Sequence, residues 1–203
     1  IMYTFGIKHT TADNMTTMLQ GSQVGPTPTF FFDYSVKDLR RDITCCPFQW
    51  TKGVQTLQSF KSWSFGKLRY EWTNRMIPTG NDDGINRQYM RYADIVLMRA
   101  ELENELNGAS AAVPYLTKIR NRAFATSDRA TEVTAYVAEA ALSKEKMFQA
   151  IVDERAYEFA GELIRKADLI RWGMLKSKMD ETKNKMKAIV SLTDYDSKHP
   201  YSQ

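Results

Sequence analysis

The sequence predicts a mainly α-helical protein, in which tetratricopeptide-like helical hairpins form a degenerate α-solenoid after a loop-rich, partly irregular N-terminal segment. From residue 88 to about 187, apolar residues recur at helical spacing and Ala, Leu, Glu, Lys and Arg dominate. Residues 1–87 carry most of the glycines and prolines and show no sustained helical period. We therefore expect a loop-rich segment 1–87, a helical-hairpin region 88–187 and an irregular tail 188–203.

Composition excludes several classes of protein. The 203 residues are 43% hydrophobic and 26% charged, which suits one packed core. No apolar run approaches the roughly 20 residues that a membrane-spanning helix needs. The net charge of +4 is spread along the chain, so we expect no nucleic-acid partner. Cys45 and Cys46 are adjacent, which fits neither a disulfide scaffold nor a zinc site, and we interpret them as small packing residues.

The first helix is expected at about residues 88–106, ended by Asn107 and Gly108. Its apolar stripe has helical spacing and comprises Tyr89, Tyr92, Ala93, Val96, Leu97 and Ala100. The second helix begins near Ser110 and tolerates Pro114 in its first turns. Its inner face comprises Val113, Leu116, Ile119, Arg120 and Ala123. Because the connection is short, the two helices should form an antiparallel hairpin.

A polar excursion follows at residues 125–141, with a short helix around 133–140. Ser143 is the predicted N-cap of a third helix, with Leu142 and Met147 as a hydrophobic staple. The buried stripe of that helix comprises Phe148, Ile151, Val152, Arg155 and Phe159. A fourth helix is expected at about residues 165–179, which would complete a second hairpin.

Three motifs in order then resemble one family. The segment RYADIVLMRAE at residues 91–101 resembles a motif that opens a helix in the SusD/RagB family of surface nutrient-binding proteins. Residues 112–122 resemble the helix that follows it, and residues 151–173 resemble the family's long charged stretch. Residues 34–41, with Asp38 and Arg40, match less specifically. The long stretch departs from the family pattern at Leu163, usually Gly, and at Lys166, usually aromatic.

The resemblance implies a largely helical, lipid-anchored protein at the extracellular face of the outer membrane of Bacteroidetes-type bacteria. Such proteins present oligosaccharides or peptides to a SusC-like TonB-dependent transporter. Family members are much longer, so we expect this chain to be the carboxyl-terminal half of one. The lipid anchor, which would be the only membrane attachment, is then absent from this chain.

Sugar binding depends on flat apolar rings on irregular segments, so Trp and Tyr side chains in residues 1–87 are the candidate ligand contacts. Trp50 and Trp63 lie among Thr, Ser, Gly, Gln and Lys, which indicates exposure, and they are the first candidates for ligand contact. Tyr34 and Trp72 complete the candidate set, although core packing stays an alternative for each ring. Residues 67–72 alternate like a strand that buries one face, and residues 30–32 (FFF) are interpreted as a buried strand or core plug.

The carboxylates of the long stretch could be metal ligands or ion-pair partners. Glu154, Glu158 and Glu162 share one helix face, but di-metal bundles need histidines, and His9 and His199 lie near the chain ends. We therefore predict structural ion pairs that join the third and fourth helices. Their members are Glu154, Arg155, Glu158, Glu162, Arg165, Asp168 and Arg171.

Other chemistry finds little support. The sequence has no Gly-x-Ser-x-Gly elbow, phosphate loop or dinucleotide fingerprint, so we predict no enzyme and no cofactor. Residues 82–86 (DDGIN) resemble an oxygen-rich calcium loop but lack its terminal bidentate Glu, so a solvated turn is favoured and calcium stays an alternative. The lysines between residues 176 and 187 are interpreted as a solvated helix face.

Together, the motifs and the aromatic residues predict a glycan-binding component of a nutrient-uptake system. In it, the helical hairpins dock on the transporter, and the segment 1–87 faces the ligand. The alternative is a helical-repeat scaffold that binds a protein or a peptide.

Overall fold

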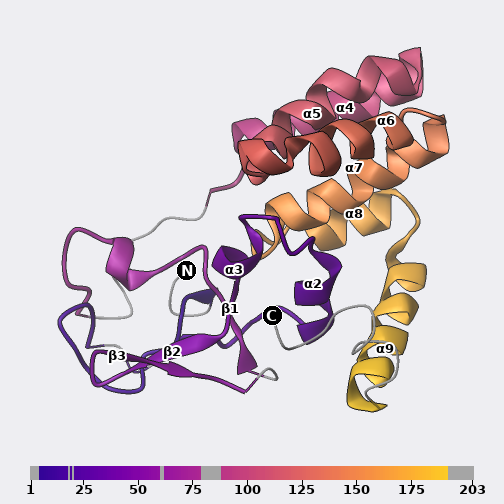
Figure 1. Ribbon diagram of the computed structural model, residues 1–203. Helices are drawn as coiled ribbons and strands as arrows, with labels where there is room; N and C mark the ends of the chain where they lie inside the picture. The colour runs from indigo at the N-terminus through magenta and orange to yellow at the C-terminus, as the bar shows by residue number, and fades with distance from the viewer. Residues whose placement is uncertain (1–4, 18, 20, 60–61, 79–87, 192–203) are drawn as a thin grey trace. The chain divides into compact units, whose positions relative to one another are not determined.

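The structure is a computed structural model that describes residues 5–17, 19, 21–59, 62–78 and 88–191. The chain forms two compact units, whose helices and strands are labelled in Figure 1. The helical unit comprises residues 35–43 and 86–160. The mixed unit comprises residues 1–34, 44–85 and 161–203. The prediction of a mainly helical chain is confirmed.

The helical unit begins with the predicted hairpin of α4 (Tyr92–Asn107) and α5 (Ala109–Ala123), which pack along each other. Gly108 joins them with a φ of 90°, a left-handed conformation that glycine adopts at little cost. The predicted helix end at Asn107-Gly108 is confirmed. The predicted start is corrected, because Arg91 is extended and Tyr89 and Tyr92 are exposed. The ammonium group of Lys118 lies over the ring of Tyr92, so this ring lies on the surface of the hairpin and not in its core.

The excursion after α5 is helical, as expected, but in short pieces. It contains a 3-10 turn, η3 (Thr126–Asp128), a π-helical turn, η4 (Ala130–Ala135), and α6 (Tyr136–Ala140). Val133 and Val137 are buried, so the excursion packs its apolar positions against α5 and α7.

The third predicted helix is α7 (Lys144–Phe159), and its cap is confirmed. The side chain of Ser143 accepts a hydrogen bond from the backbone N–H of Lys146 at 3.1 Å, which satisfies a donor that the first turn leaves open. The staple prediction is wrong, because Leu142 is exposed while Met147 is buried.

The core of the helical unit lies between α4, α5 and α7. Small residues, Ala93, Ala100 and Ala112, sit on the facing sides and let the helices approach closely. Larger side chains fill the remaining space: Val96, Leu97, Leu116, Ile119, Met147, Ile151, Val152 and Phe159.

The mixed unit contains two small antiparallel sheets. Strands β2 (Phe48–Thr51) and β3 (Val54–Leu57) form a hairpin, in which Lys52 and Gly53 both have positive φ. Two successive positive φ values match the twist of a two-residue hairpin turn. Strand β1 (Cys45–Cys46) pairs with β4 (Ser64–Phe65), and both cysteines are buried, as packing residues should be.

The strand predicted at residues 67–72 is wrong, and so is the strand alternative for residues 30–32, whereas the core-plug alternative agrees with the burial of Phe32. The Phe-rich run lies in a helix, α2 (Pro28–Asp33), with proline at its first position, and Phe32 is its most buried ring. The alternating run before residue 73 ends in a 3-10 turn, η2 (Tyr70–Trp72), with Tyr70 buried and Trp72 exposed. The backbone hydrogen bonds of both segments are helical, so neither the continuous apolar run nor the alternating run identified a strand.

The fourth predicted helix is also corrected. The chain forms two helices, α8 (Arg165–Arg171) and α9 (Leu175–Ser191), both in the mixed unit. Gly173 separates them with a φ of 67°, which a continuous helix cannot contain. Helix α9 contacts α2, where Phe32 packs against Ile189 and Nζ of Lys185 lies 2.6 Å from Asp33.

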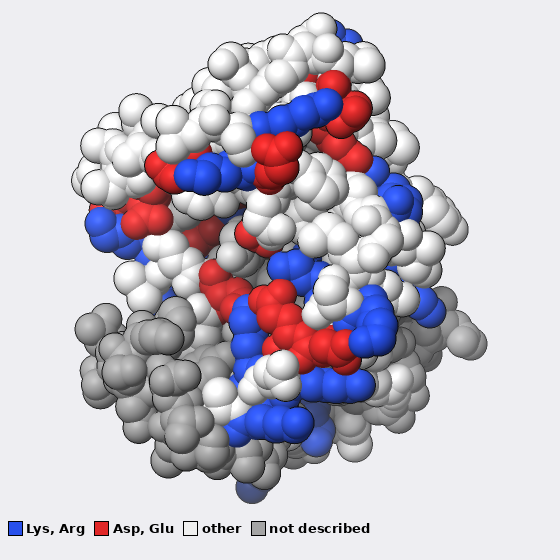
Figure 2. Space-filling view, turned by 90° about the vertical axis from the view of Figure 1, so that its right-hand side faces the viewer, with Lys and Arg blue, Asp and Glu red and all other residues white. Residues whose placement is uncertain are grey.

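Lysines of α9 pair with acidic residues in the middle of the same helix. Lys176 pairs with Asp180 at 2.7 Å, and Lys178 pairs with Glu181 at 2.9 Å. Burial would lower the pKa of Lys185, but Asp33 and Glu181 outweigh it and raise the pKa to about 12. Figure 2 shows one face of the molecule on which positive and negative side chains lie next to one another. This mixture fits the predicted solvated helix face.

The predicted division at residues 87 and 187 stays a prediction. Its first boundary and the predicted calcium turn at residues 82–86 lie outside the described residues, as does most of the predicted tail. Among the helices that the structure describes, none is long and apolar enough to span a membrane.

Candidate functional site

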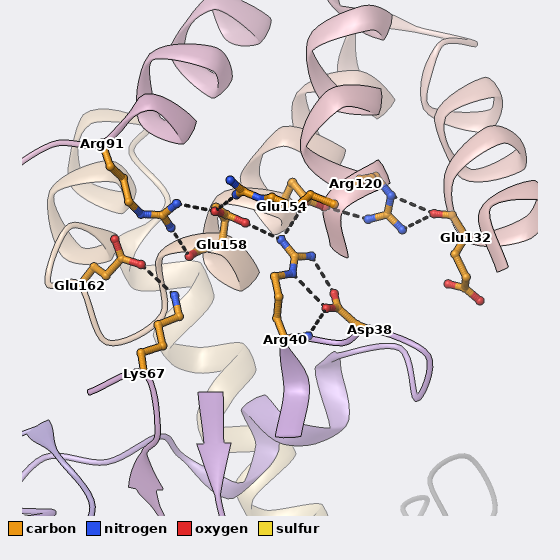
Figure 3. Close-up of polar contacts among 10 residues, drawn as sticks. Asp38, Arg40, Lys67, Arg91, Arg120, Glu132, Glu154, Glu158 and Glu162 are labelled. Carbon is orange, nitrogen blue, oxygen red and sulfur yellow. Dashed lines mark hydrogen bonds and ion pairs between the residues drawn. The ribbon is translucent and has the colours of Figure 1, made fainter. Parts of the chain in front are cut away.

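Helix α7 carries two buried glutamates one turn apart, Glu154 and Glu158, and arginines from other segments converge on them (Figure 3). Glu154 is fully buried. Its Oε1 accepts a hydrogen bond from Nη1 of Arg40 at 2.7 Å, and its Oε2 accepts one from Nη1 of Arg120 at 2.8 Å. Each oxygen of this carboxylate therefore pairs with a different arginine.

Glu158 accepts from three arginines. Its Oε2 lies 2.8 Å from Nη1 of Arg40, and its Oε1 lies 2.5 Å from Nη1 of Arg91 and also accepts from Nη2 of Arg122. Burial by itself would raise the pKa of Glu158, but the hydrogen bonds and charges of Arg91 and Arg40 lower it below the ordinary value. Glu158 is therefore ionised at neutral pH.

Arg40 enters the network from the short segment 35–43. Asp38 holds its guanidinium in a bidentate pair, with Nε to Oδ1 at 2.9 Å and Nη2 to Oδ2 at 2.7 Å. The backbone N–H of Leu39 donates to the carbonyl of Ala123 at 3.0 Å, which attaches the segment to the end of α5. Burial would lower the pKa of Arg40, but Glu154 and Asp38 raise it, so this arginine stays charged.

Arg120 projects from α5 into the same network (Figure 3). Besides Glu154, it donates from Nε and Nη2 to the backbone carbonyl of Glu132, at 2.9 and 2.5 Å. Its guanidinium lies 3.7 Å from the ring centroid of Tyr136. Burial raises the pKa of Tyr136 to about 12, so the phenol stays neutral beside the ion pairs.

These contacts describe a structural network. The carboxylate oxygens of Glu154 and Glu158 accept hydrogen bonds from guanidinium groups, an arrangement that joins the segment 35–43, the start of α4 and helix α5 to α7. Among the described residues, no group of three or more His, Cys, Asp or Glu side chains is placed to hold a metal ion. The geometry supports helix packing and shows no arrangement for acid–base chemistry in this part of the chain.

The predicted pairing of the third helix with the fourth stays a prediction, and two of its arginines have partners that the structure describes. Nη1 of Arg155 lies 2.7 Å from Asp94, so this arginine joins α7 to α4. Nε of Arg171 lies 2.9 Å from Asp168 within the single helix α8. Both arginines form ion pairs: Arg171 pairs at the i,i+3 spacing of one helix, whereas the partner of Arg155 is 61 residues away and could not be chosen from helical spacing.

The remaining predicted members lie in the mixed unit. Nζ of Lys67 lies 2.8 Å from Oε1 of Glu162, a pair that is partly exposed (Figure 3). The guanidinium of Arg165 lies 6.0 Å from the ring centroid of Trp172. Glu162 therefore does not continue the face of Glu154 and Glu158, because α7 ends at Phe159.

Sequence reasoning missed most of the arginines that hold the two glutamates. They are Arg40, Arg91, Arg120 and Arg122, and each lies in one of the segments that carry the family resemblance. The family motifs could therefore have identified these arginines as candidates for the network. Spacing along the chain could not say which carboxylate each arginine meets.

Trp50 is half-buried and not exposed as predicted, because it lies within strand β2. Its ring stacks on the ring of His9 at a centroid distance of 6.1 Å. The backbones of His9 and Trp50 also pair in an isolated parallel β-bridge. His9 is itself fully buried, and its Nδ1 lies 2.8 Å from Oδ2 of Asp13. The edge of Tyr70 completes this aromatic packing at 5.2 Å from His9.

Trp63 and Tyr34 also differ from the expectation. Trp63 is half-buried, and its ring meets the ring of Phe31 edge to face at 5.0 Å. Tyr34 is only 3% exposed and packs edge to face on Phe30, so its ring faces are closed to a ligand. Tyr34 is therefore a packing residue.

Trp72 is the indole that the mixed unit presents to solvent, at 58% exposure. It is the last residue of η2, and the guanidinium of Arg69 lies 4.8 Å from its ring centroid. Of the four aromatic candidates, only Trp72 exposes more than half of its surface.

Several buried polar atoms of the mixed unit have no hydrogen-bond partner within the protein. Among its described residues, these are Nε2 of His9, Oγ1 of Thr44, Nε1 of Trp50, OH of Tyr70 and Oε2 of Glu71. Burial raises the pKa of Tyr70, so its hydroxyl is neutral.

The fold and the charged network together define a class: a mainly helical protein in which motif arginines join helices through buried carboxylates. The chain belongs to the SusD family, whose family model matches residues 51–202.

Two relatives of this chain are longer than the part that it matches. It is 48% identical to SusD-like protein P25 of Formosa agariphila over 90 residues, which are 44% of this chain and 16% of that protein. The crystal structure of a SusD homolog from Bacteroides thetaiotaomicron matches with a TM-score of 0.75 at 22% identity, over 87% of this chain and 38% of that one. At this identity the second match shows the fold alone. The chain spans well under half the length of both relatives.

Proposed function

We propose that this chain is part of a surface glycan-binding component of a TonB-dependent nutrient-uptake system and that it performs no catalysis. The observation that carries the proposal is the match of the SusD family model to residues 51–202. The exposed indole of Trp72 supports it, because a flat apolar ring suits the C–H face of a sugar. The arginine-bound carboxylates of α7 support the non-catalytic part.

Trp72 is the first proposed ligand contact. Trp50 and Trp63 follow it, because only part of each ring is accessible.

The full-length protein would sit at the extracellular face of the outer membrane, held by a lipid anchor and by a SusC-like transporter. Co-purification of that transporter with the full-length protein tests the partner.

Glycan binding is tested with an oligosaccharide array and a peptide panel probed in parallel. Trp72→Ala should weaken binding to the best array sugar by more than about 1 kcal/mol, roughly fivefold, as truncation of a central aromatic contact does. Leu57→Ala is the matched control, since Leu57 is an exposed apolar side chain of the same unit. Binding confined to peptides, or equal affinities for both variants and the parent chain, would overturn the proposal.

A further inference from the structure

The exposed ring of Trp72 is held by an unusual set of contacts. Trp72 ends the 3-10 turn η2, and Arg69 is the N-cap residue of that turn. The guanidinium of Arg69 lies over the indole of Trp72, at 4.8 Å from the ring centroid.

Arg69 is itself fixed on three sides. Its Nε donates to the backbone carbonyl of Gly66 at 2.6 Å. Its Nη1 lies 3.7 Å from Oε1 of Glu71, within ion-pair range. Its guanidinium also lies over the ring of Phe48 in strand β2, at 5.5 Å. Its side chain is only 12% exposed, so a nearly buried group bridges a strand residue and an exposed ring.

The turn that carries Trp72 is fixed as well. The N–H of Trp72 donates to the carbonyl of Arg69, and the N–H of Thr73 donates to the carbonyl of Tyr70 at 2.9 Å. The hydroxyl of Thr73 donates to the same carbonyl at 2.7 Å. Tyr70 is buried and attaches the turn to the core of the mixed unit.

We propose that Arg69 is a positioning residue that holds the indole of Trp72 in place, so that one ring face is covered by the guanidinium and the other is open to a ligand. A ring that is already immobile loses less conformational freedom when it binds, which favours affinity. The planar guanidinium can stack on an aromatic ring, whereas a lysine ammonium acts as a point charge. The benefit for sugar binding rests on the proposed function, but the positioning of the ring does not.

The test is ¹⁹F NMR of the 203-residue chain labelled with 5-fluorotryptophan, recorded without sugar. The chain has four tryptophans, and Trp72→Phe identifies the Trp72 resonance. In Arg69→Met we expect that resonance to narrow and to move toward the position of the free amino acid, while the other three stay in place. Arg69→Lys should give a position between those of the parent and of Arg69→Met.

Arg75→Met is the matched control, because Arg75 is an exposed arginine just after the turn, and it should leave the Trp72 resonance in place. An unchanged Trp72 resonance in Arg69→Met would overturn the proposal. Movement of all four resonances would also overturn it, because Arg69 would then support the whole fold. Because the spectra are recorded without sugar, an array that shows no sugar binding would overturn the proposed function and not the positioning role of Arg69. An unchanged Trp72 resonance would overturn the positioning role and not the proposed function.

Discussion

The helical unit and the mixed unit satisfy their buried polar groups in different ways. In the helical unit, Glu154, Glu158 and Arg120 are buried, and each makes at least two hydrogen bonds to charged or backbone groups. In the mixed unit, Nε2 of His9 and the hydroxyl of Tyr70 have no partner within the protein, and in the helical unit Oδ1 of Asn104 has none. The helical unit therefore pairs the buried charges of α7 inside its core, whereas the buried aromatic cluster of the mixed unit leaves two polar atoms without a protein partner.

This difference predicts which substitutions each unit tolerates without a large loss of stability. Removing a buried carboxylate such as Glu154 leaves the charge of Arg120 without its carboxylate partner and removes one partner of Arg40. A buried hydroxyl without a partner can be removed at little cost. We expect the helical unit to be intolerant of substitution at its buried charged positions and the mixed unit to be tolerant at its unpaired polar atoms.

The largest expected effect is that of Glu154→Ala. Removing this carboxylate leaves Arg40 and Arg120 buried without their common partner, which should lower the free energy of unfolding by about 3–5 kcal/mol. Chemical denaturation followed by far-UV circular dichroism measures it. The control is Glu105→Ala, whose exposed pair with Lys144 also reaches α7 and should cost less than about 1 kcal/mol. Equal losses in the two variants would contradict the comparison.

A second effect should depend on pH through Glu158. Its pKa in the folded protein lies below the ordinary value of 4.5, so the folded state binds this proton more weakly than the unfolded state. The stabilisation is complete above about pH 4.5 and is lost as the pH falls through the folded pKa. The free energy of unfolding measured against pH should therefore fall less steeply on the acid side in Glu158→Gln. Parallel curves for the two proteins would show that Glu158 does not contribute.

The smallest expected effect is that of Tyr70→Phe in the mixed unit. The variant removes only a buried hydroxyl without a protein partner, so the free energy of unfolding should change by less than about 1 kcal/mol. Tyr70→Ala removes the whole buried ring and should cost about 3–5 kcal/mol. The same denaturation experiment compares them. A large loss in Tyr70→Phe would mean that the hydroxyl has a partner in solution, and the contrast between the units would fail.

Local signals predicted the helical unit well. The hairpin of α4 and α5 followed from periodicity and from Gly108, and the start of α7 followed from the cap at Ser143. Gly173 lies at the break between α8 and α9, where its φ is positive. The sequence alone did not predict this break, because a single glycine can also lie within a continuous helix.

The candidate site was less predictable. Composition around Trp50 and Trp63 indicated exposure, but strand pairing and stacking half-bury both rings. Trp72 was assigned to a strand, and its exposure depends on the 3-10 turn that buries Tyr70 in its place. Burial of a ring is decided by residues distant in sequence, which no local pattern contains.

The sequence by itself determined the helical character of the chain, its caps and turns, and the motifs that indicate its family. These features depend on residues within a few positions of one another, where backbone geometry is the dominant constraint. Only the tertiary structure decided which arginine meets which glutamate and which indole reaches solvent. Both outcomes depend on desolvation and on the packing of distant segments, and spacing along the chain carries no information about either.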